Sequence, residues 1–259
     1  MTLSVERLTF GYGKTPVLKD VGFTAEQGEV IAVLGPNGAG KTTLFRCMLG
    51  EQRQYAGSIR IDGIEAKTLS PRSMAHHVAY IPQTHPMTFR FSVRDMVLMG
   101  TTHRISPLAV PRAKEEQAAA DAMEKLGIGA LAEKDFDCIS GGEQQLVYIA
   151  RALAQQAKIL VMDEPTASLD YGNQLYVLSV VRALAREGHT VLVSTHNPQH
   201  ALWYADRVLA MRAGQVEAFG PVQETLTPAL IETLYGRHVH LEQTAGGPVI
   251  VPAPEELDQ

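Results

Sequence analysis

A glycine-rich segment directly after an apolar run most constrains how this chain can fold. Residues 35–42 read Gly-Pro-Asn-Gly-Ala-Gly-Lys-Thr and follow the five apolar residues Val30–Leu34. The pattern GxxxxGK[ST] between a predicted strand and a predicted helix is typical of a loop that wraps its backbone N–H groups around a polyphosphate. Glycine is required there because a β-carbon would collide with the ligand and because positive φ is needed. A plain glycine-rich turn with a solvated lysine is the weaker interpretation, since it leaves this context unexplained.

The loop predicts specific contacts to a nucleotide. We expect Lys41 to reach the β- and γ-phosphates and the Thr42 hydroxyl to bind Mg²⁺, while the N-terminus of the following helix adds the positive end of its dipole. The residues predicted to surround the phosphates are Gly35, Pro36, Asn37, Gly38, Ala39, Gly40, Lys41, Thr42 and Thr43.

Short apolar runs alternate with helix-like stretches along the chain. This alternation predicts an α/β fold with a mainly parallel sheet covered by helices on both faces. The predicted core strands are Val30–Leu34, Val78–Ile81, Ile159–Met162 and Val191–Ser194. Two helices are predicted to end at glycines that suit a left-handed cap, one over 41–49 before Gly50 and one over 173–187 before Gly188.

Two segments break the alternation. Leu3–Phe10 with Gly57–Asp62 is predicted to form antiparallel strands beside the core. Residues 86–157 are helix-rich, with one helix over Arg112–Leu126, and we expect them to form an inserted helical subdomain. One domain would then span 1–240, and 241–259 would be a short C-terminal tail.

Composition narrows the function classes. Lys and Arg number 23 against 28 Asp and Glu, a net charge of −5, which argues against nucleic acid as a partner. The N-terminus lacks the pattern of a signal peptide, and no apolar run is long enough to span a membrane, so we expect a cytosolic chain unless a partner docks it to a membrane. Cys47 and Cys138 form no CxxC pair, and we predict two reduced thiols.

A second candidate site follows a later apolar run. Ile159–Met162 is followed directly by Asp163 and Glu164. In parallel sheets, ligands bind outside the carboxyl ends of the strands, where these two carboxylates would lie. We expect Asp163 to hold Mg²⁺ through its water shell and Glu164 to polarise an attacking water. An ordinary strand end is the alternative, and the phosphate-binding loop upstream favours the catalytic interpretation.

Between these motifs, residues 139–143 read Ile-Ser-Gly-Gly-Glu. This segment closely resembles the LSGGQ signature of ABC transporter ATPases, and the resemblance covers roughly residues 1–240. It implies a RecA-like P-loop NTPase core with an antiparallel β subdomain and an inserted helical subdomain. It also implies that Ser140, Gly141, Gly142 and Glu143 contact ATP bound by the opposite subunit. Ser140 and Glu143 independently have the spacing of a helix capping box, and both interpretations can hold together.

The resemblance assigns further residues one by one. Tyr12 matches the aromatic that stacks on adenine, although a strand-end tyrosine packing on its own subdomain is the alternative. Gln83 matches the glutamine that touches Mg²⁺ and water, Asp170 lies in the loop through which the two subunits sense each other, and His196 matches the histidine at the γ-phosphate. A plain turn is the alternative for Asp170, and a neutral loop histidine is the alternative for His196.

The segment departs from the family pattern at three positions. Ile139 replaces Leu, Glu143 replaces Gln, and Leu146 stands where a basic residue is common. We expect these departures to tune activity without abolishing it, because Ser140 and the glycines are intact.

The resemblance implies an ATPase that works as a head-to-tail homodimer with ATP and Mg²⁺ beneath a dimeric integral-membrane permease. It would then lie on the cytoplasmic face of the inner membrane, and an extracytoplasmic binding protein would deliver cargo. The sequence of residues 71–100 resembles the corresponding segment in importers of iron siderophores, haem and cobalamin. Met99–Arg104 departs from the sequence that is usual there. The alternatives are a soluble ABC-type ATPase that remodels a ribosome, DNA or a protein complex, and a nucleotide-gated binding module without turnover.

Overall fold

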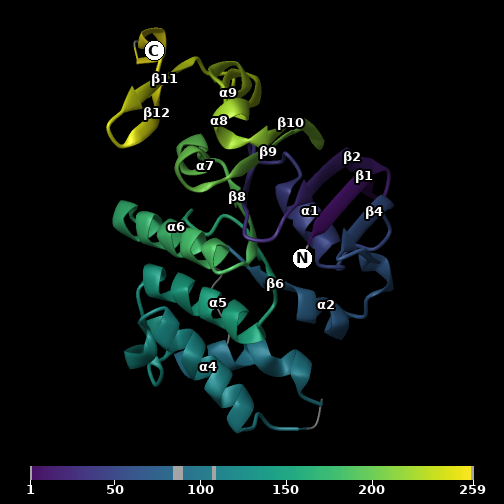
Figure 1. Ribbon diagram of the computed structural model, residues 1–259, viewed down its shortest axis with the longest axis vertical. Helices are drawn as coiled ribbons and strands as arrows, with labels where there is room; N and C mark the ends of the chain where they lie inside the picture. Colours follow the sequence, from purple (N-terminus) through teal and green to yellow (C-terminus); the bar gives the residue numbers. More distant parts are fainter. Residues whose placement is uncertain (1, 84–89, 107–108, 258–259) are drawn as a thin grey trace. The chain divides into compact units, whose positions relative to one another are not determined.

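The computed structural model describes residues 2–83, 90–106 and 109–257 (Figure 1). The chain divides into two compact units, one formed by Met1–Thr68 with Val181–Gln259 and the other by Leu69–Val180. The helix α6 (Tyr171–Arg186) runs through the boundary between them.

Four neighbouring strands form the central sheet of the first unit, in the order β10-β9-β3-β8. The strand β3 (Val30–Leu34) pairs in parallel with β8 (Thr190–Thr195) and with β9 (Arg207–Arg212). The edge strand β10 (Gln215–Pro221) pairs antiparallel with β9. Every residue of β3 and β8 is buried, in agreement with the apolar runs from which both core strands were predicted. Neither β9 nor β10 was predicted from the sequence.

An antiparallel sheet in the order β2-β1-β4-β5 completes this unit's β structure. The predicted pair is confirmed as β1 (Leu3–Tyr12) against β4 (Ala56–Ile61). Two members were not predicted, β2 (Thr15–Ala25) and the short β5 (Ile64–Glu65). The predicted helix after the glycine-rich loop is α1 (Lys41–Met48), and Gly50 has a φ of 73° just beyond it.

The second unit is mostly helical. The helix α2 (Pro71–His77) leads into β6 (Val78–Ile81), which pairs in parallel with β7 (Ile159–Met162). The described residues between these strands form α3 (Val93–Leu98), α4 (Ala113–Lys125), α5 (Gly141–Gln155) and three short 3-10 helices at Met99–Arg104, Gly129–Leu131 and Phe136–Cys138. The helix predicted over Arg112–Leu126 is therefore confirmed with one residue fewer at each end.

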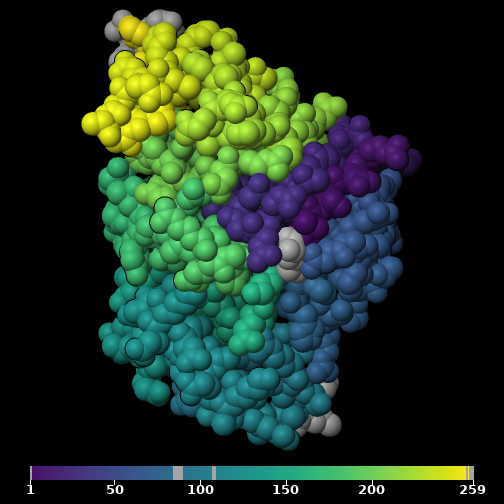
Figure 2. All heavy atoms as spheres, viewed as in Figure 1, coloured from purple at the N-terminus to yellow at the C-terminus, as the bar shows by residue number. Residues whose placement is uncertain are grey.

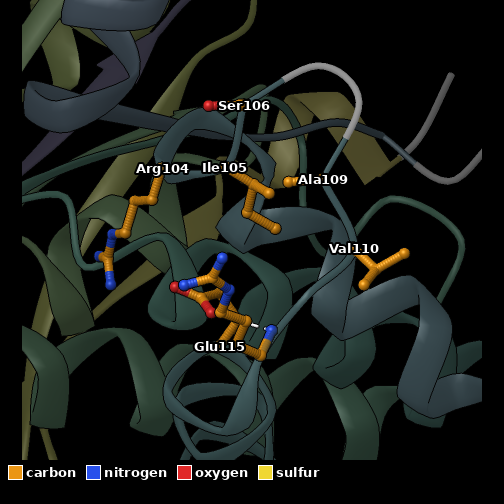
Figure 3. Close-up of a pocket in the computed structure, with 7 residues that line it drawn as sticks. Arg104, Ile105, Ser106, Ala109, Val110 and Glu115 are labelled. Carbon is orange, nitrogen blue, oxygen red and sulfur yellow. Dashed lines mark hydrogen bonds between the residues drawn. The ribbon is translucent and has the colours of Figure 1, made fainter.

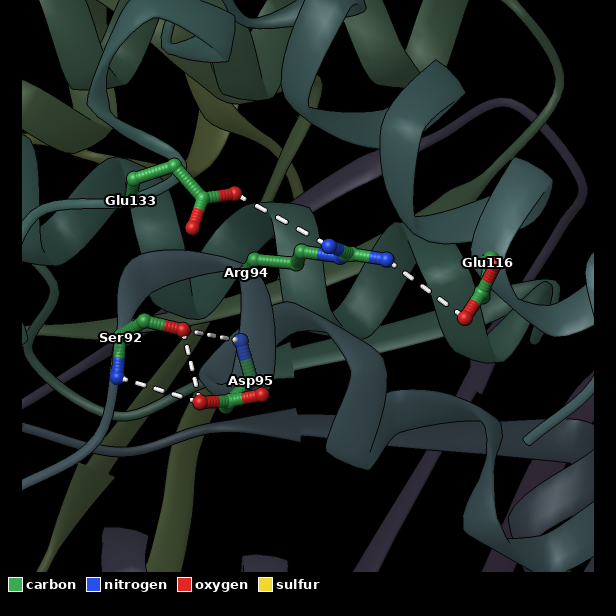
Figure 4. A network of polar contacts seen from close by, with 5 residues as sticks. All are labelled: Ser92, Arg94, Asp95, Glu116 and Glu133. Carbon is green, nitrogen blue, oxygen red and sulfur yellow. Dashed lines mark hydrogen bonds and ion pairs between the residues drawn. The ribbon is translucent and has the colours of Figure 1, made fainter. Parts of the chain in front are cut away.

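Polar contacts join the ends of these helices (Figure 4). Ser92 and Asp95 form a capping box at the start of α3. Next to it, Arg94 lies 3.5 Å from Glu116 of α4 and 3.9 Å from Glu133. Exposed ion pairs of this kind contribute at most about 1 kcal/mol each, so the apolar contacts of Val93, Met96 and Met123 dominate the packing.

The C-terminal residues form regular structure that the sequence analysis did not predict. After α8 (Val222–Thr225) and α9 (Pro228–Tyr235), the strands β11 (Val239–Thr244) and β12 (Gly247–Pro252) form an antiparallel hairpin, followed by α10 (Pro254–Leu257). These segments appear in yellow-green and yellow in Figure 2. Three side chains of the hairpin, those of Val239, Leu241 and Ile250, pack on a buried cluster. This cluster includes residues of β3.

None of the helices in the described part of the chain has the length and apolar character needed to cross a bilayer. Both cysteines are free thiols, Cys47 buried in α1 and Cys138 exposed, in agreement with the prediction.

Candidate functional site

The glycine-rich loop joins β3 to α1 in the first unit. Gly38 and Gly40 have φ values of 79° and 104°, a region that favours glycine. The Lys41 side chain is buried, and its Nζ donates hydrogen bonds to the carbonyl oxygens of Gly35 at 2.7 Å and Pro36 at 3.3 Å. The ammonium group therefore lies over the backbone of its own loop, at the N-terminus of α1.

Packing within the chain limits the space at two of the loop glycines. A β-carbon on Gly35 would stand 2.2 Å from the Met211 carbonyl oxygen, and one on Gly40 would stand 2.9 Å from Leu18. By contrast, a β-carbon on Gly38 would have no atom within 4 Å. Gly38 thus borders open space at the turn of the loop, which fits a ligand as bulky as a polyphosphate.

Tyr12 lies at the end of β1 and is 44% exposed. Its ring meets Phe10 edge to face, with centroids 5.0 Å apart. The two alternatives raised from the sequence are therefore compatible, since Tyr12 packs on Phe10 of its own subdomain while part of its side chain stays exposed for a stacking partner.

His196 follows β8 directly and is exposed. The next residue, Asn197, caps α7 (Pro198–Tyr204): its side chain accepts a hydrogen bond from the Gln199 N–H, and its own N–H donates to Thr195 Oγ1 at 3.0 Å. The predicted helix start at Asn197–Pro198 is thus confirmed. One turn on, His200 is buried, and its pKa is lowered by burial and, to a smaller extent, by His196.

The paired carboxylates belong to the second unit, at the end of β7. Asp163 is buried, and the Tyr80 hydroxyl of β6 donates to its Oδ2 at 3.4 Å. Glu164 is partly buried and has a φ of 46°. A left-handed backbone at a residue other than glycine is strained, and such strain concentrates at functional sites. With this φ, the backbone at Glu164 departs from the extended conformation of β7.

The signature segment opens α5. Ser140 Oγ and Ser140 N both donate to Glu143 Oε2, at 2.8 and 2.7 Å, and the Glu143 N–H donates to Ser140 Oγ at 3.3 Å. The predicted capping box is confirmed. These bonds from the Ser140 backbone and hydroxyl lower the pKa of Glu143. Leu146 is buried within this unit, which explains an apolar residue where a basic one is common.

Asp170 caps the start of α6. Its carboxylate accepts from Asn173 N at 2.8 Å and from Asn173 Nδ2 at 2.9 Å. The Asn173 amide in turn lies against Gly142 of the signature. Neither Asn173 nor Tyr80 was predicted as a site residue, because no local pattern pointed to either. Gln83 is exposed two residues after β6.

A pocket of about 240 Å³ also lies in the second unit, between the 3-10 helix that ends at Arg104 and the start of α4 (Figure 3). Its walls are Arg104, Ile105, Ser106, Ala109, Val110, Arg112 and Glu115. No predicted site residue is among these described wall residues, and Glu115 is engaged by the Arg112 N–H at 3.0 Å.

Known proteins resemble this chain along nearly its whole length. The family model for the ABC transporter matches residues 18–167. The hemin import ATP-binding protein HmuV of Rhodococcus jostii is 34% identical, over 99% of this chain and 88% of that protein. The cobalamin import ATP-binding protein BtuD of Halobacterium salinarum is 35% identical, over 98% of this chain and 64% of that protein.

A solved structure described as the inward-facing conformation of a transporter assigned to the metal-chelate ABC type is 32% identical, with a TM-score of 0.87 and 99% of both chains covered. The family match covers more than half of the chain, and the fold agrees with that of the ATP-binding cassettes. The chain therefore belongs to the ABC transporter family, as an ATP-binding subunit that hydrolyses ATP.

Proposed function

We propose that this chain is the ATP-hydrolysing subunit of an importer for a metal chelate, with haem, cobalamin or an iron siderophore as cargo. The observation that carries the proposal is the likeness over 99% of both chains, at a TM-score of 0.87, to a transporter of the metal-chelate type. The names of the hemin and cobalamin import relatives support the same cargo class.

In the first unit, the proposed roles concern the nucleotide itself. Lys41 exchanges its bonds to Gly35 and Pro36 for the β- and γ-phosphates, because phosphate oxygens are stronger acceptors for an ammonium group than carbonyl oxygens. Tyr12 stacks on the adenine. His196, at the start of α7, donates a hydrogen bond to the γ-phosphate.

Mg²⁺ is the proposed cofactor. The resemblance assigns the Thr42 hydroxyl and the Gln83 amide to this ion and Asp163 to its water shell, and oxygen groups of these kinds are the ligands that Mg²⁺ prefers over nitrogen or sulfur. In the described part of the chain no group of three His, Cys, Asp or Glu residues could hold a metal alone, which suits an ion that shares its shell with substrate phosphates and water. When bound, the ion neutralises charge that develops on the phosphates.

Glu164 is proposed as the group that orients and polarises the attacking water. It follows β7 and the buried Asp163 in the chain, and its backbone is left-handed, with a φ of 46°. Separate roles for the two acids are supported by their different surroundings, since Asp163 accepts a hydrogen bond from Tyr80 whereas Glu164 has a left-handed backbone.

The signature segment is proposed to complete the site of a second copy. Ser140, Gly141, Gly142 and Glu143 open α5, where the helix dipole and backbone N–H groups favour a phosphate. Two copies would then close head to tail on two ATP molecules, with the Asp170 loop between the sites. Hydrolysis would reopen the pair and move the permease.

The proposed partners follow from this cycle. A permease dimer would dock near Gln83 and Pro86–Met99, of which residues 86–89 lie outside the described part of the chain. The subunits would sit on the cytoplasmic face of the membrane, and an extracytoplasmic binding protein would deliver the chelate. The relatives are import subunits, which disfavours the alternative of a soluble ATPase that remodels a ribosome, DNA or protein complex.

The test is reconstitution in lipid with the permease encoded beside this chain and its binding protein. ATP-dependent uptake should appear for one of haem, cobalamin or an iron chelate, and the loaded binding protein should raise ATPase activity. An oxyanion serves as the control cargo. Uptake of the oxyanion alone would contradict the cargo class, and the absence of stimulation together with co-purification on ribosomes or DNA would favour the soluble ATPase.

A further inference from the structure

The C-terminal hairpin is hydrogen-bonded to α7, the helix that begins just after His196. The side-chain amide of Gln199 in α7 contacts the β12 backbone twice: its Nε2 donates to the Pro248 carbonyl at 3.2 Å, and its Oε1 accepts from the Ile250 N–H at 2.7 Å. Trp203, one turn along α7, also donates to the Pro248 carbonyl at 3.2 Å.

The Gln199 side-chain amide forms both hydrogen bonds with the outer edge of β12, the edge that does not face β11. Residues i and i+2 of a strand direct their backbone groups to the same side. Pro248 and Ile250 therefore present one carbonyl and one N–H on a single edge, and the Gln199 amide satisfies both as a further strand would. A two-stranded hairpin is marginally stable alone, so this edge contact helps to fix it in place.

The opposite side of α7 packs on the core of the first unit. Ala201 and Leu202 belong to the buried cluster that contains Ala32 and Leu34, the latter directly before the phosphate-binding loop. Ile250 of the hairpin packs on the same cluster. A helix of seven residues has little stability of its own, so its direction depends on these contacts.

Gln199 also reaches the residue next to His196. Its backbone N–H donates to Asn197 Oδ1 at 2.9 Å, while Asn197 N donates to Thr195 Oγ1 at 3.0 Å. His196 lies between Thr195 and Asn197 in the sequence, joined to each by one peptide bond. A displacement of the first turn of α7 would therefore move the His196 backbone directly.

We infer that Gln199 is a positioning residue for the ATPase reaction: through it, the C-terminal hairpin holds His196 in place for the γ-phosphate. The inference rests on the proposed role of His196. It gives residues 239–252 a part in turnover, although they lie outside the segment matched by the family model. Ångström-scale displacements of a contacting group can cost as much as about 100-fold in rate.

The test uses the purified full-length chain with Mg-ATP. Gln199→Leu removes both amide contacts and should lower kcat about 10-fold while the KM for ATP changes less than about twofold, because the histidine contact matters chiefly in the transition state. Gln199→Glu keeps the acceptor for the Ile250 N–H, so its kcat should lie between that of Gln199→Leu and that of the unaltered chain. Gln117→Leu is the matched control, since Gln117 bonds Asp121 within α4 at 2.7 Å.

A double-mutant cycle separates positioning from general destabilisation. In a His196→Ala background, Gln199→Leu should cost almost nothing further in kcat. The inference would be overturned if Gln199→Leu lowered kcat as much in the His196→Ala background as in the unaltered chain, or if Gln199→Leu and Gln117→Leu had equal kcat values. Either result would leave the proposed role of His196 unaffected. Normal turnover by His196→Ala would overturn the proposed role of the histidine as well. If Gln199→Leu fails to fold, Gln199→Glu carries the same cycle.

Discussion

The amide of Asn173 lies so close to Gly142 that a β-carbon built on the glycine would stand 2.6 Å from the Asn173 side-chain carbon. Asp170 holds that amide through the Asn173 Nδ2 at 2.9 Å. The space at the second glycine of the signature is thus limited by a neighbour in the same chain, apart from any contact to phosphate. A steric link joins the Asp170 loop to the start of α5.

Gly142→Ala should destabilise the second unit by about 1 to 3 kcal/mol, because the new methyl group must displace Asn173 or shift the backbone of α5. Urea unfolding measures the change. Adding Asn173→Ala should recover part of the loss, since it vacates the space that the methyl group needs. Gly141→Ala is the control, because a β-carbon there would come no closer than 3.9 Å to Leu169. Strictly additive losses in the double variant would contradict the steric link.

Glu164→Gln should keep ATP binding and slow turnover by about 10²- to 10⁴-fold, because the amide cannot polarise the attacking water. This corresponds to roughly 3 to 5 kcal/mol of barrier. The variant should also accumulate as an ATP-bound dimer in size-exclusion chromatography. Turnover close to that of the unaltered chain would remove Glu164 from the mechanism.

Ser140→Arg should abolish hydrolysis and leave the ATP affinity of the isolated monomer almost unchanged, because Ser140 is proposed to serve the nucleotide of the other copy. Lys41→Ala should lose binding itself, since the ammonium group lies over the phosphate-binding loop. Equilibrium titration with a fluorescent ATP analogue compares the two variants. Equal losses of monomer affinity would show that the site is completed within one chain.

Glu143 should make the stability of the chain depend on pH in the acid range. Hydrogen bonds from the Ser140 N–H and hydroxyl lower its pKa, so the folded state prefers the ionised carboxylate. The stabilisation is present above the ordinary glutamate pKa of about 4.3 and is lost as the pH falls through the lowered value.

The difference in unfolding free energy between the unaltered chain and Glu143→Gln should therefore shrink below about pH 4. Urea unfolding at pH 7, 5, 4 and 3 measures it. Glu133→Gln is a control on an exposed carboxylate that only borders Arg94 at 3.9 Å. A difference that stays constant down to pH 3 would rule out the predicted linkage.

The sequence by itself determined the local features of this protein. The strands β3, β6, β7 and β8 were predicted because their largely apolar runs favour burial, and the ends of α1 and α6 were predicted because left-handed caps favour glycine. The capping box at Ser140 and the helix start at Asn197 were also predicted from the sequence, since each depends on residues within three positions of one another.

Only the tertiary structure decided the relationships between distant segments. Gln199 meets Pro248 and Ile250 across 49 and 51 positions, and nothing in 241–259 alone predicts a hairpin, because its pairing needs α7 and the core beneath it. The close approach of the Met211 carbonyl to Gly35 and the left-handed φ of Glu164 likewise arise from packing that no local pattern encodes. Backbone propensity acts over a few residues, whereas these features depend on which surfaces meet when the chain folds.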